Sequence, residues 1–299
     1  MALRLEGTYT ALVTPFADEP GQPIDWNAFD AFVDAQIAGG VAGVVPCGTT
    51  GECATLTPEE HRKVIERTVV RVKRRVQVVA GTGSNSTREA VALSQDAERA
   101  GADAVMVIVP YYNRPSQEGL FRHFVEVSKS VTLPVVLYNV PARTGVDLTA
   151  ETLARIAEAA PNVVAIKEAT GNVLRAQQIA RTLGDRIVVL SGDDGITLPM
   201  IAVGARGVVS VTSNALPAEV AHATRLALEG KVDEARRAHL RLLPVHEAMF
   251  IEASPAPVKA ALEMARAMKA TVRSPLAPCS EAGRRTVAAA IEGLSRGPR

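Results

Sequence analysis

Short apolar segments alternate with longer amphipathic ones along most of the chain, and each pair occupies about 25–30 residues, the size of one strand and one helix. The apolar segments are rich in Val, Ile and Ala and mostly lack polar alternation, which is typical of parallel strands covered by helices. The predicted strands span residues 8–14, 43–47, 77–81, 104–109, 135–139, 163–167, 187–191 and 207–211.

The segments between these strands carry the start and stop signals of helices. Thr57 is predicted to be an N-cap, with Glu60 at the capping-box position. Ser86 and Glu89 stand in the same relation, and the helix that they begin is predicted to end at Gly101.

Eight such units with one crossover hand predict an α/β fold, a closed (β/α)8 TIM barrel. The alternative is an open doubly wound sheet, which predicts a glycine-rich turn after the first strand, whereas the chain there reads "VTPFADEPGQP". The strand pattern then ends, and helical stretches follow at residues 232–246, 255–268 and 280–294. We therefore predict a barrel domain over residues 1–230 and a C-terminal helical appendage over residues 231–299.

Composition argues against several function classes. The chain is 47% hydrophobic and 22% charged, as in ordinary soluble proteins. Its 33 basic and 32 acidic residues leave a net charge of +1, which gives no support for a nucleic-acid or membrane partner. The three cysteines are scattered and form no disulfide framework, and we find no signal pattern and no apolar run near the about 18 residues of a membrane span. We expect a cytoplasmic protein.

The most informative residue is Lys167, at the end of the predicted strand "VVAIK". Alternation places Val163, Ala165 and Lys167 on one face of that strand. If this face points into the barrel, desolvation lowers the pKa of the amine, and a neutral amine can form a Schiff base with a ketone. The alternative is a lysine that is exposed at the strand end or paired with Glu168.

Other polar residues follow the strands, where the active sites of TIM barrels lie. Tyr138 shares a face with Val136 and could relay protons, or it could be an ordinary core tyrosine. The turn "GTTGE" with Thr49 and Thr50 could bind a carboxylate, or it could be a plain loop. Arg143 could hold a second carboxylate, or it could be a surface residue.

The residues of these loops give little support for a metal site or a nucleophilic cysteine. Asp193 and Asp194 lack a histidine or a third carboxylate at ligand spacing, so we expect no metal site. Cys47 and Cys53 flank the "GTTGE" turn, but no base partner for a nucleophilic thiol can be located.

The motifs "GTTGE", "YYNRPSQEGL", "YNVPARTG", "IKEATGN" and "SGDD" together resemble the dihydrodipicolinate synthases of the N-acetylneuraminate lyase superfamily, which are class I aldolase-type barrels. The resemblance covers nearly the whole chain, including "ASPAPVKAAL" in the appendage. It implies that pyruvate forms an imine on Lys167 without another cofactor, and that the enamine attacks L-aspartate 4-semialdehyde. The implied product is 4-hydroxy-tetrahydrodipicolinate, in lysine and diaminopimelate biosynthesis.

The resemblance also implies roles for residues around that lysine. Tyr138, Thr50 and Tyr112 would form a proton relay, with Tyr112 supplied by a neighbouring subunit of a homotetramer built as a dimer of dimers. The residues expected to bind the substrates are Thr49 and Thr50 for the pyruvate carboxylate, Arg143 for the semialdehyde carboxylate, and Gly192 and Val209 through their backbones.

A feedback site for L-lysine is implied at six matching positions: His61, Asn85, Glu89, Tyr111, Cys53 and Ala54. Cys53 stands where a serine is usual, and Pro58 where some members have a histidine. The alternative is that His61 and Glu89 are only interface or surface residues. We expect moderate inhibition by lysine.

The choice within the superfamily depends on few residues. Arg143 and both threonines of "GTTGE" favour a small aldehyde that carries its own carboxylate. The alternative is another pyruvate-dependent Schiff-base enzyme, such as a 4-hydroxy-2-oxoglutarate aldolase or an N-acetylneuraminate lyase. A pyridoxal phosphate anchor and a non-catalytic barrel are two further readings of Lys167.

Overall fold

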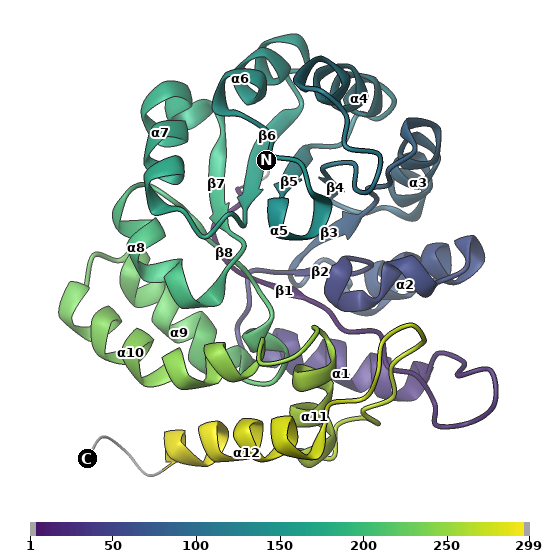
Figure 1. Cartoon of the computed structure of the whole chain (residues 1–299), viewed down its shortest axis with the longest axis vertical. Helices are drawn as coiled ribbons and strands as arrows, with labels where there is room; N and C mark the ends of the chain where they lie inside the picture. Colours follow the sequence, from purple (N-terminus) through teal and green to yellow (C-terminus); the bar gives the residue numbers. More distant parts are fainter. Residues whose placement is uncertain (1–3, 296–299) are drawn as a thin grey trace.

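The computed structural model describes residues 4–295, in which eight parallel strands close into a barrel (Figure 1). Because β1 pairs with both β2 and β8, the TIM barrel is confirmed and the open sheet is excluded. The predicted strands are also confirmed, and their ends differ from the observed ones by at most three residues. The strands are β1 (Gly7–Ala11), β2 (Gly43–Val45), β3 (Gln77–Gly81), β4 (Ala104–Ile108), β5 (Val135–Asn139), β6 (Val163–Glu168), β7 (Val188–Ser191) and β8 (Gly207–Ser210).

Helices surround the barrel on its outside, and a short helix, α5 (Pro141–Thr144), follows the carboxyl end of β5 (Figure 1). The outer helices are α1 (Trp26–Ala38), α2 (Pro58–Val72), α3 (Thr87–Ala100), α4 (Gln117–Lys129), α6 (Ala150–Ala159), α7 (Val173–Leu183), α8 (Thr197–Ala202) and α9 (Pro217–Leu228).

The helix signals in the sequence are confirmed with one exception. Thr57 and Glu60 form a complete capping box at the start of α2. Ser86 caps α3, and Gly101 ends it with a φ of 86°. The reciprocal half of the second box is wrong, because the carboxylate of Glu89 accepts a hydrogen bond from the Ser84 hydroxyl instead.

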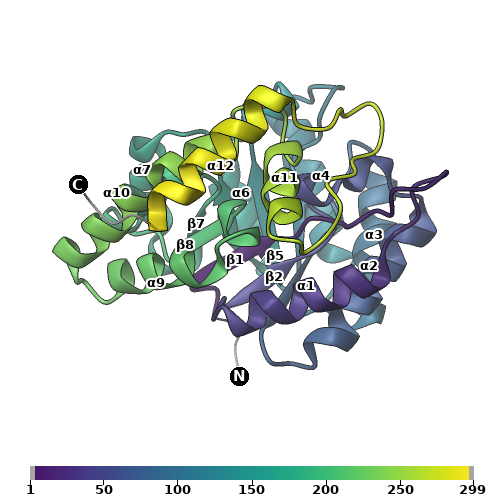
Figure 2. The same cartoon turned by 90° about the horizontal axis from the view of Figure 1, so that it is seen from below.

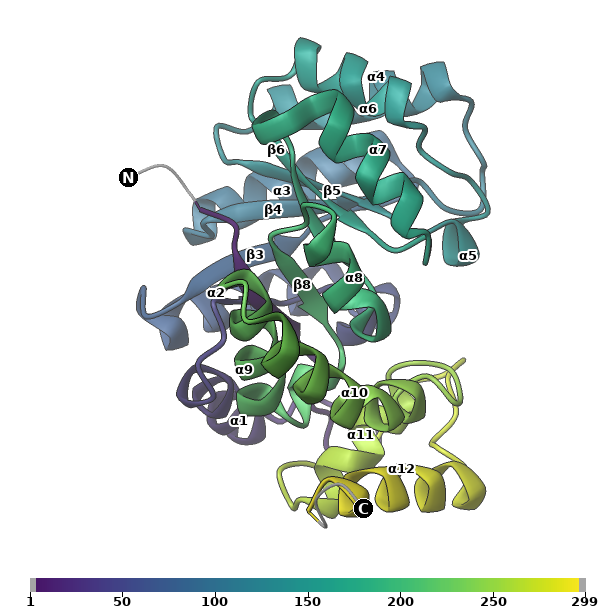
Figure 3. The same cartoon turned by 90° about the vertical axis from the view of Figure 1, so that its left-hand side faces the viewer.

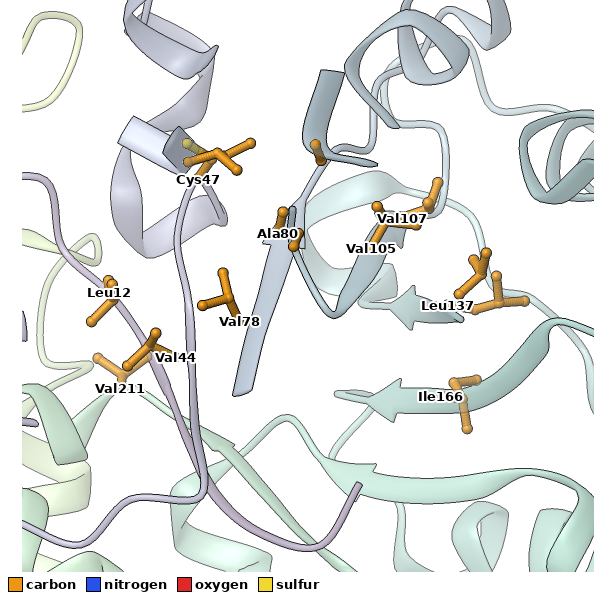
Figure 4. Packing of buried hydrophobic residues seen from close by; sticks show 14 of the residues in the cluster. Leu12, Val44, Cys47, Val78, Ala80, Val105, Val107, Leu137, Ile166 and Val211 are labelled. Carbon is orange, nitrogen blue, oxygen red and sulfur yellow. The ribbon is translucent and has the colours of Figure 1, made fainter. Parts of the chain in front are cut away.

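The core has two layers, one on each face of the strands. The outer layer packs the strands against the helices, and Figure 4 shows part of it, with Leu12, Val44, Cys47, Val78, Ala80, Val105, Val107, Leu137, Ile166 and Val211 labelled. The inner layer fills the barrel and includes Val136, Tyr138 and Ala165. The shared face of Val136 and Tyr138 is therefore confirmed.

The face assigned to Val163 is wrong. Val163 pairs with Val135, but the next pair joins Ala165 to Val136, so Val164 is an extra residue in β6. Such a bulge breaks strand alternation. Val163 accordingly lies in the outer layer, whereas Ala165 lies in the inner one.

Three further helices form the C-terminal appendage: α10 (Val232–Ala248), α11 (Ala256–Met264) and α12 (Glu281–Ser295). They pack against one another, and α10 also packs against α9 (Figures 2 and 3). All three match predicted stretches, although α11 ends four residues early. The division into domains at residue 230 stays a prediction. No helix within residues 4–295 is both long and apolar enough to cross a bilayer.

Candidate active site

A cavity of about 380 Å³ lies at the carboxyl ends of the strands, with walls from both the barrel and the appendage. The barrel residues that line it include Thr49, Thr50, Tyr138, Arg143, Lys167 and Gly192. The appendage contributes His246, Glu247, Phe250 and Ser254. Five of the predicted catalytic and substrate-binding residues thus meet Lys167 in one space.

Lys167 is held almost out of water at the penultimate position of β6, with an exposed fraction of 6%. Burial lowers its pKa from 10.5 to about 7; the charge of Arg143 acts in the same direction, and that of Asp194 opposes it. The amine lies 4.0 Å from the centre of the Tyr138 ring. A substantial share of this lysine is therefore neutral and nucleophilic near pH 7.

Both alternatives for Lys167 are wrong: it is not exposed, and it is not paired with Glu168. The Glu168 carboxylate is buried and accepts hydrogen bonds from Nε of Arg175 at 2.7 Å and from the backbone N–H of Thr170 at 2.8 Å. Because adjacent residues of a strand point to opposite faces, the Glu168 carboxylate points away from the cavity that the Lys167 amine faces.

Tyr138 is buried beside this amine, and burial raises the pKa of its phenol, while Arg143 and a hydrogen bond with the Thr49 side chain oppose the rise. The structure thus brings Thr49, rather than Thr50, to the Tyr138 hydroxyl. Thr50 also lines the cavity, and both lie in a turn of 3-10 helix, η1 (Thr49–Gly51).

Arg143 lies in α5, with its side chain at the wall of the cavity. Within residues 4–295 it forms no ion pair, so its guanidinium is free to bind an anion. A planar guanidinium can hold a carboxylate through two parallel hydrogen bonds.

Gly192 lies in the cavity wall at a position where the chain packs tightly against Ala169. A Cβ atom at this position would lie 2.5 Å from Cβ of Ala169, so a side chain does not fit. Val209 packs in the inner layer beneath and does not line the cavity. Its predicted backbone contribution stays a prediction.

Comparison with known proteins now identifies the family. The model of the dihydrodipicolinate synthetase family matches residues 4–294. The chain is 54% identical to the 4-hydroxy-tetrahydrodipicolinate synthase of Sorangium cellulosum over 292 residues, which is 98% of this chain and 97% of the relative. The chain belongs to the dihydrodipicolinate synthetase family.

Two solved members of this family carry ligands. The Acinetobacter baumannii dihydrodipicolinate synthase, complexed with pyruvate, has a TM-score of 0.95 and 38% identity over 98% of this chain and 99% of its own. The Cyanidioschyzon merolae enzyme, with lysine bound, has a TM-score of 0.93 and 35% identity over 97% and 98%.

The remaining relay candidate of the family, Tyr112, lies outside the cavity. Its side chain is 88% exposed, and its φ of 72° places the backbone in the left-handed region. A second cavity of about 310 Å³ adjoins the first and shares Thr49, Tyr138 and Arg143 with it. The origin of Tyr112 in a neighbouring subunit stays a prediction.

The predicted feedback positions lie near one another, because, besides the larger effect of burial, the charge of Glu89 acts to raise the pKa of both His61 and Tyr111, and the backbone of Asn85 bonds to Tyr111. Cys53, Ala54 and Tyr111 line the second cavity. His61 is buried, and its Nε2 lies 2.9 Å from the carbonyl oxygen of Gly81. The Glu89 carboxylate accepts a hydrogen bond from the Ser84 hydroxyl, and the backbone carbonyl of Asn85 accepts one from the Asn113 side chain at 2.8 Å. A lysine site at these positions stays a prediction.

Sequence reasoning missed the appendage side of the site. His246, Glu247 and Phe250 lie at the end of α10, whose position over the barrel depends on tertiary packing that no local pattern encodes. It considered Asp194 only as a metal ligand, whereas this buried carboxylate accepts from the backbone N–H of Val211 at 2.9 Å and acts to raise the pKa of Lys167. Within residues 4–295 no group of three His, Cys, Asp or Glu side chains could hold a metal ion.

The neutral amine can be tested without a substrate. Trace acetylation of Lys167 with acetic anhydride should rise with pH through about 7, because only the neutral amine reacts. Peptide mass spectrometry measures the modified fraction, with the exposed Lys73 as reference for the reagent.

The variant Arg143→Gln should move the midpoint of this rise in acetylation to higher pH, because the arginine charge holds the pKa of Lys167 down. Asp194→Asn should move it to lower pH. An unchanged midpoint in both variants would contradict this electrostatic account.

Proposed function

We propose that this protein condenses pyruvate with L-aspartate 4-semialdehyde to give 4-hydroxy-tetrahydrodipicolinate, the product named for its relatives. The observation that carries the proposal is Lys167, a buried amine with a pKa of about 7 at the carboxyl end of a barrel strand. Identity of about 50% with several synthases over most of the chain favours this reaction over the alternative aldolases and lyases.

The chemistry follows from the neutral amine. The nitrogen of Lys167 attacks the ketone carbon of pyruvate, and loss of water gives a protonated imine. Loss of a methyl proton gives the enamine, whose carbon attacks the aldehyde of the second substrate. The amino group of that substrate then attacks the imine carbon, which closes the ring and releases the lysine. No other cofactor is required.

A proton relay is needed because the imine and the new alcohol both exchange protons. We assign it to Tyr138 and Thr49, since both side chains line the cavity beside the lysine and Thr49 acts to lower the pKa of the Tyr138 phenol. Thr50, the residue first expected in the relay, is assigned to the pyruvate carboxylate together with the backbone of η1.

We propose that Tyr112 completes the relay of a partner subunit. Its exposed position and the open second cavity next to Tyr138 support this exchange between protomers. A homotetramer built from such dimers, and a cytoplasmic location, stay predictions.

The substrate carboxylates are assigned by charge and space. Arg143 would bind the carboxylate of the semialdehyde, because its guanidinium has no ion pair in the described chain. Gly192 would let pyruvate approach the backbone, where any larger residue collides with Ala169. Val209 would contribute only through its backbone, since its side chain is buried below.

Borohydride reduction in the presence of pyruvate tests the proposed function. The peptide that contains Lys167 should gain a reduced pyruvate adduct, because borohydride traps the imine, and Lys167→Ala should abolish the adduct. The control is reduction without pyruvate. An unmodified Lys167 peptide, or an adduct on another lysine, would overturn the mechanism.

The two threonines can be separated by matched variants. Thr49→Val should lower kcat by about 100-fold, the size of a lost proton-transfer partner, while borohydride trapping of pyruvate persists. Thr50→Val should mainly raise KM for pyruvate. The opposite pattern would return the relay role to Thr50.

Feedback by L-lysine is proposed at Cys53, Ala54 and Tyr111, because they share one cavity and a relative has been solved with lysine bound. Steady-state rates should fall as lysine reaches the millimolar range, and Tyr111→Ala should weaken the effect. Rates that do not change up to that range would contradict the site.

A further inference from the structure

Among the ion pairs of residues 4–295, one is completely buried and joins two distant motifs. Nζ of Lys259, in α11, lies 2.5 Å from Oε1 of Glu52, and neither side chain is exposed at all. Glu52 belongs to the "GTTGE" turn and Lys259 to "ASPAPVKAAL" in the appendage. The pair therefore connects the catalytic end of the barrel to the C-terminal helices.

Both charged groups have further partners, although burial lowers the pKa of Lys259 to about 8 against the opposing effect of Glu52. Nζ of Lys259 also donates to the carbonyl oxygen of Thr271 at 2.8 Å, and Oε2 of Glu52 accepts from the backbone N–H of Arg273 at 2.9 Å. The ring of Phe16 lies 4.3 Å from Nζ of Lys259 and 4.2 Å from Cζ of Arg273. Buried charges need partners of this kind, and removal of one partner leaves the other uncompensated.

The backbone at Glu52 is strained, so the contacts of its side chain help to hold its conformation. Glu52 has a φ of 56° and a ψ of 36°, the left-handed conformation that a residue with a side chain rarely adopts. Such a conformation persists only where its surroundings hold it. Glu52 is the single residue between η1, which carries Thr49 and Thr50, and the turn η2 (Cys53–Thr55).

A second anchor holds the far side of the same segment. The guanidinium of Arg273 donates two hydrogen bonds to the Glu60 carboxylate, at 2.8 and 2.6 Å, and a third to the carbonyl oxygen of Thr55 at 3.1 Å. The segment from residue 52 to residue 60 is thus fixed at both ends by the chain that follows α11.

We propose that Glu52 and Lys259 are positioning residues for the condensation. Their ion pair sets the orientation of the turn that presents Thr49 to Tyr138 and Thr50 to the carboxylate of pyruvate. This inference rests on the proposed function, because it assigns the pair a role in pyruvate binding and proton transfer.

Four variants of the full chain separate positioning from simple stability. Glu52→Gln and Lys259→Met each leave one buried charge unpaired, and the double variant removes both charges at nearly unchanged volume. The matched control is Glu263→Gln, which alters a partly exposed ion pair with Arg284 in the same appendage. The measurements are Tm, kcat, and KM for pyruvate.

We expect both single variants to lose Tm and about tenfold in kcat/KM for pyruvate, since small displacements of positioning groups have effects of this order. The double variant should regain most of the Tm but keep the about tenfold loss, because the remaining contacts from Arg273 do not replace the orienting contact between the two side chains. Glu263→Gln should leave kcat/KM unchanged.

A double variant with wild-type kcat/KM would overturn the inference, because the pair would then serve stability alone. If the double variant does not fold, Glu52→Asp decides, since it keeps the charge and shortens the reach. It should raise KM for pyruvate several-fold, and an unchanged KM overturns the inference. A wild-type chain that traps no pyruvate overturns the proposed function instead.

Discussion

The removal of one amine from water is the constraint on which the site depends. The pKa of Lys167 falls from 10.5 to about 7, which corresponds to about 5 kcal/mol in favour of the neutral form. The closed barrel offers this environment at a strand end, because its inner layer excludes solvent while its mouth stays open to a substrate. The small Ala165 in the inner layer leaves room for the long side chain.

Two charged side chains change the pKa of Lys167 beyond the effect of burial. Arg143 lowers the pKa of the lysine, and Asp194 raises it. Asp194 is itself fixed by hydrogen bonds from the Ser210 hydroxyl and the Val211 N–H, so its distance from the amine is set by the backbone of β8 and the loop after it. These opposing effects of Arg143 and Asp194 suit the reaction, because the lysine nitrogen must be neutral when it attacks the ketone and carries a positive charge once the protonated imine has formed.

Local sequence patterns predicted the strands, the caps and the place of Lys167, because these depend on alternation and on contacts a few residues apart. They could not predict the extra residue Val164, which reverses the face of Val163, since a bulge depends on the partner strand. Nor could they distinguish Thr49 from Thr50 beside Tyr138, because a turn of 3-10 helix directs neighbouring side chains differently. The appendage wall with His246 and Phe250 required the packed structure.

The loops of a TIM barrel come from separate strand–helix units, so the strands fix where each loop starts but not how it is oriented. In this protein the orienting contacts of the "GTTGE" turn come from outside the barrel. Lys259 and Arg273 reach it from the appendage, and the appendage also closes one wall of the cavity. A barrel that ended at residue 230 would leave the Glu52 carboxylate without its cation and Lys167 nearer to solvent. The catalytic unit is therefore the barrel together with its C-terminal helices.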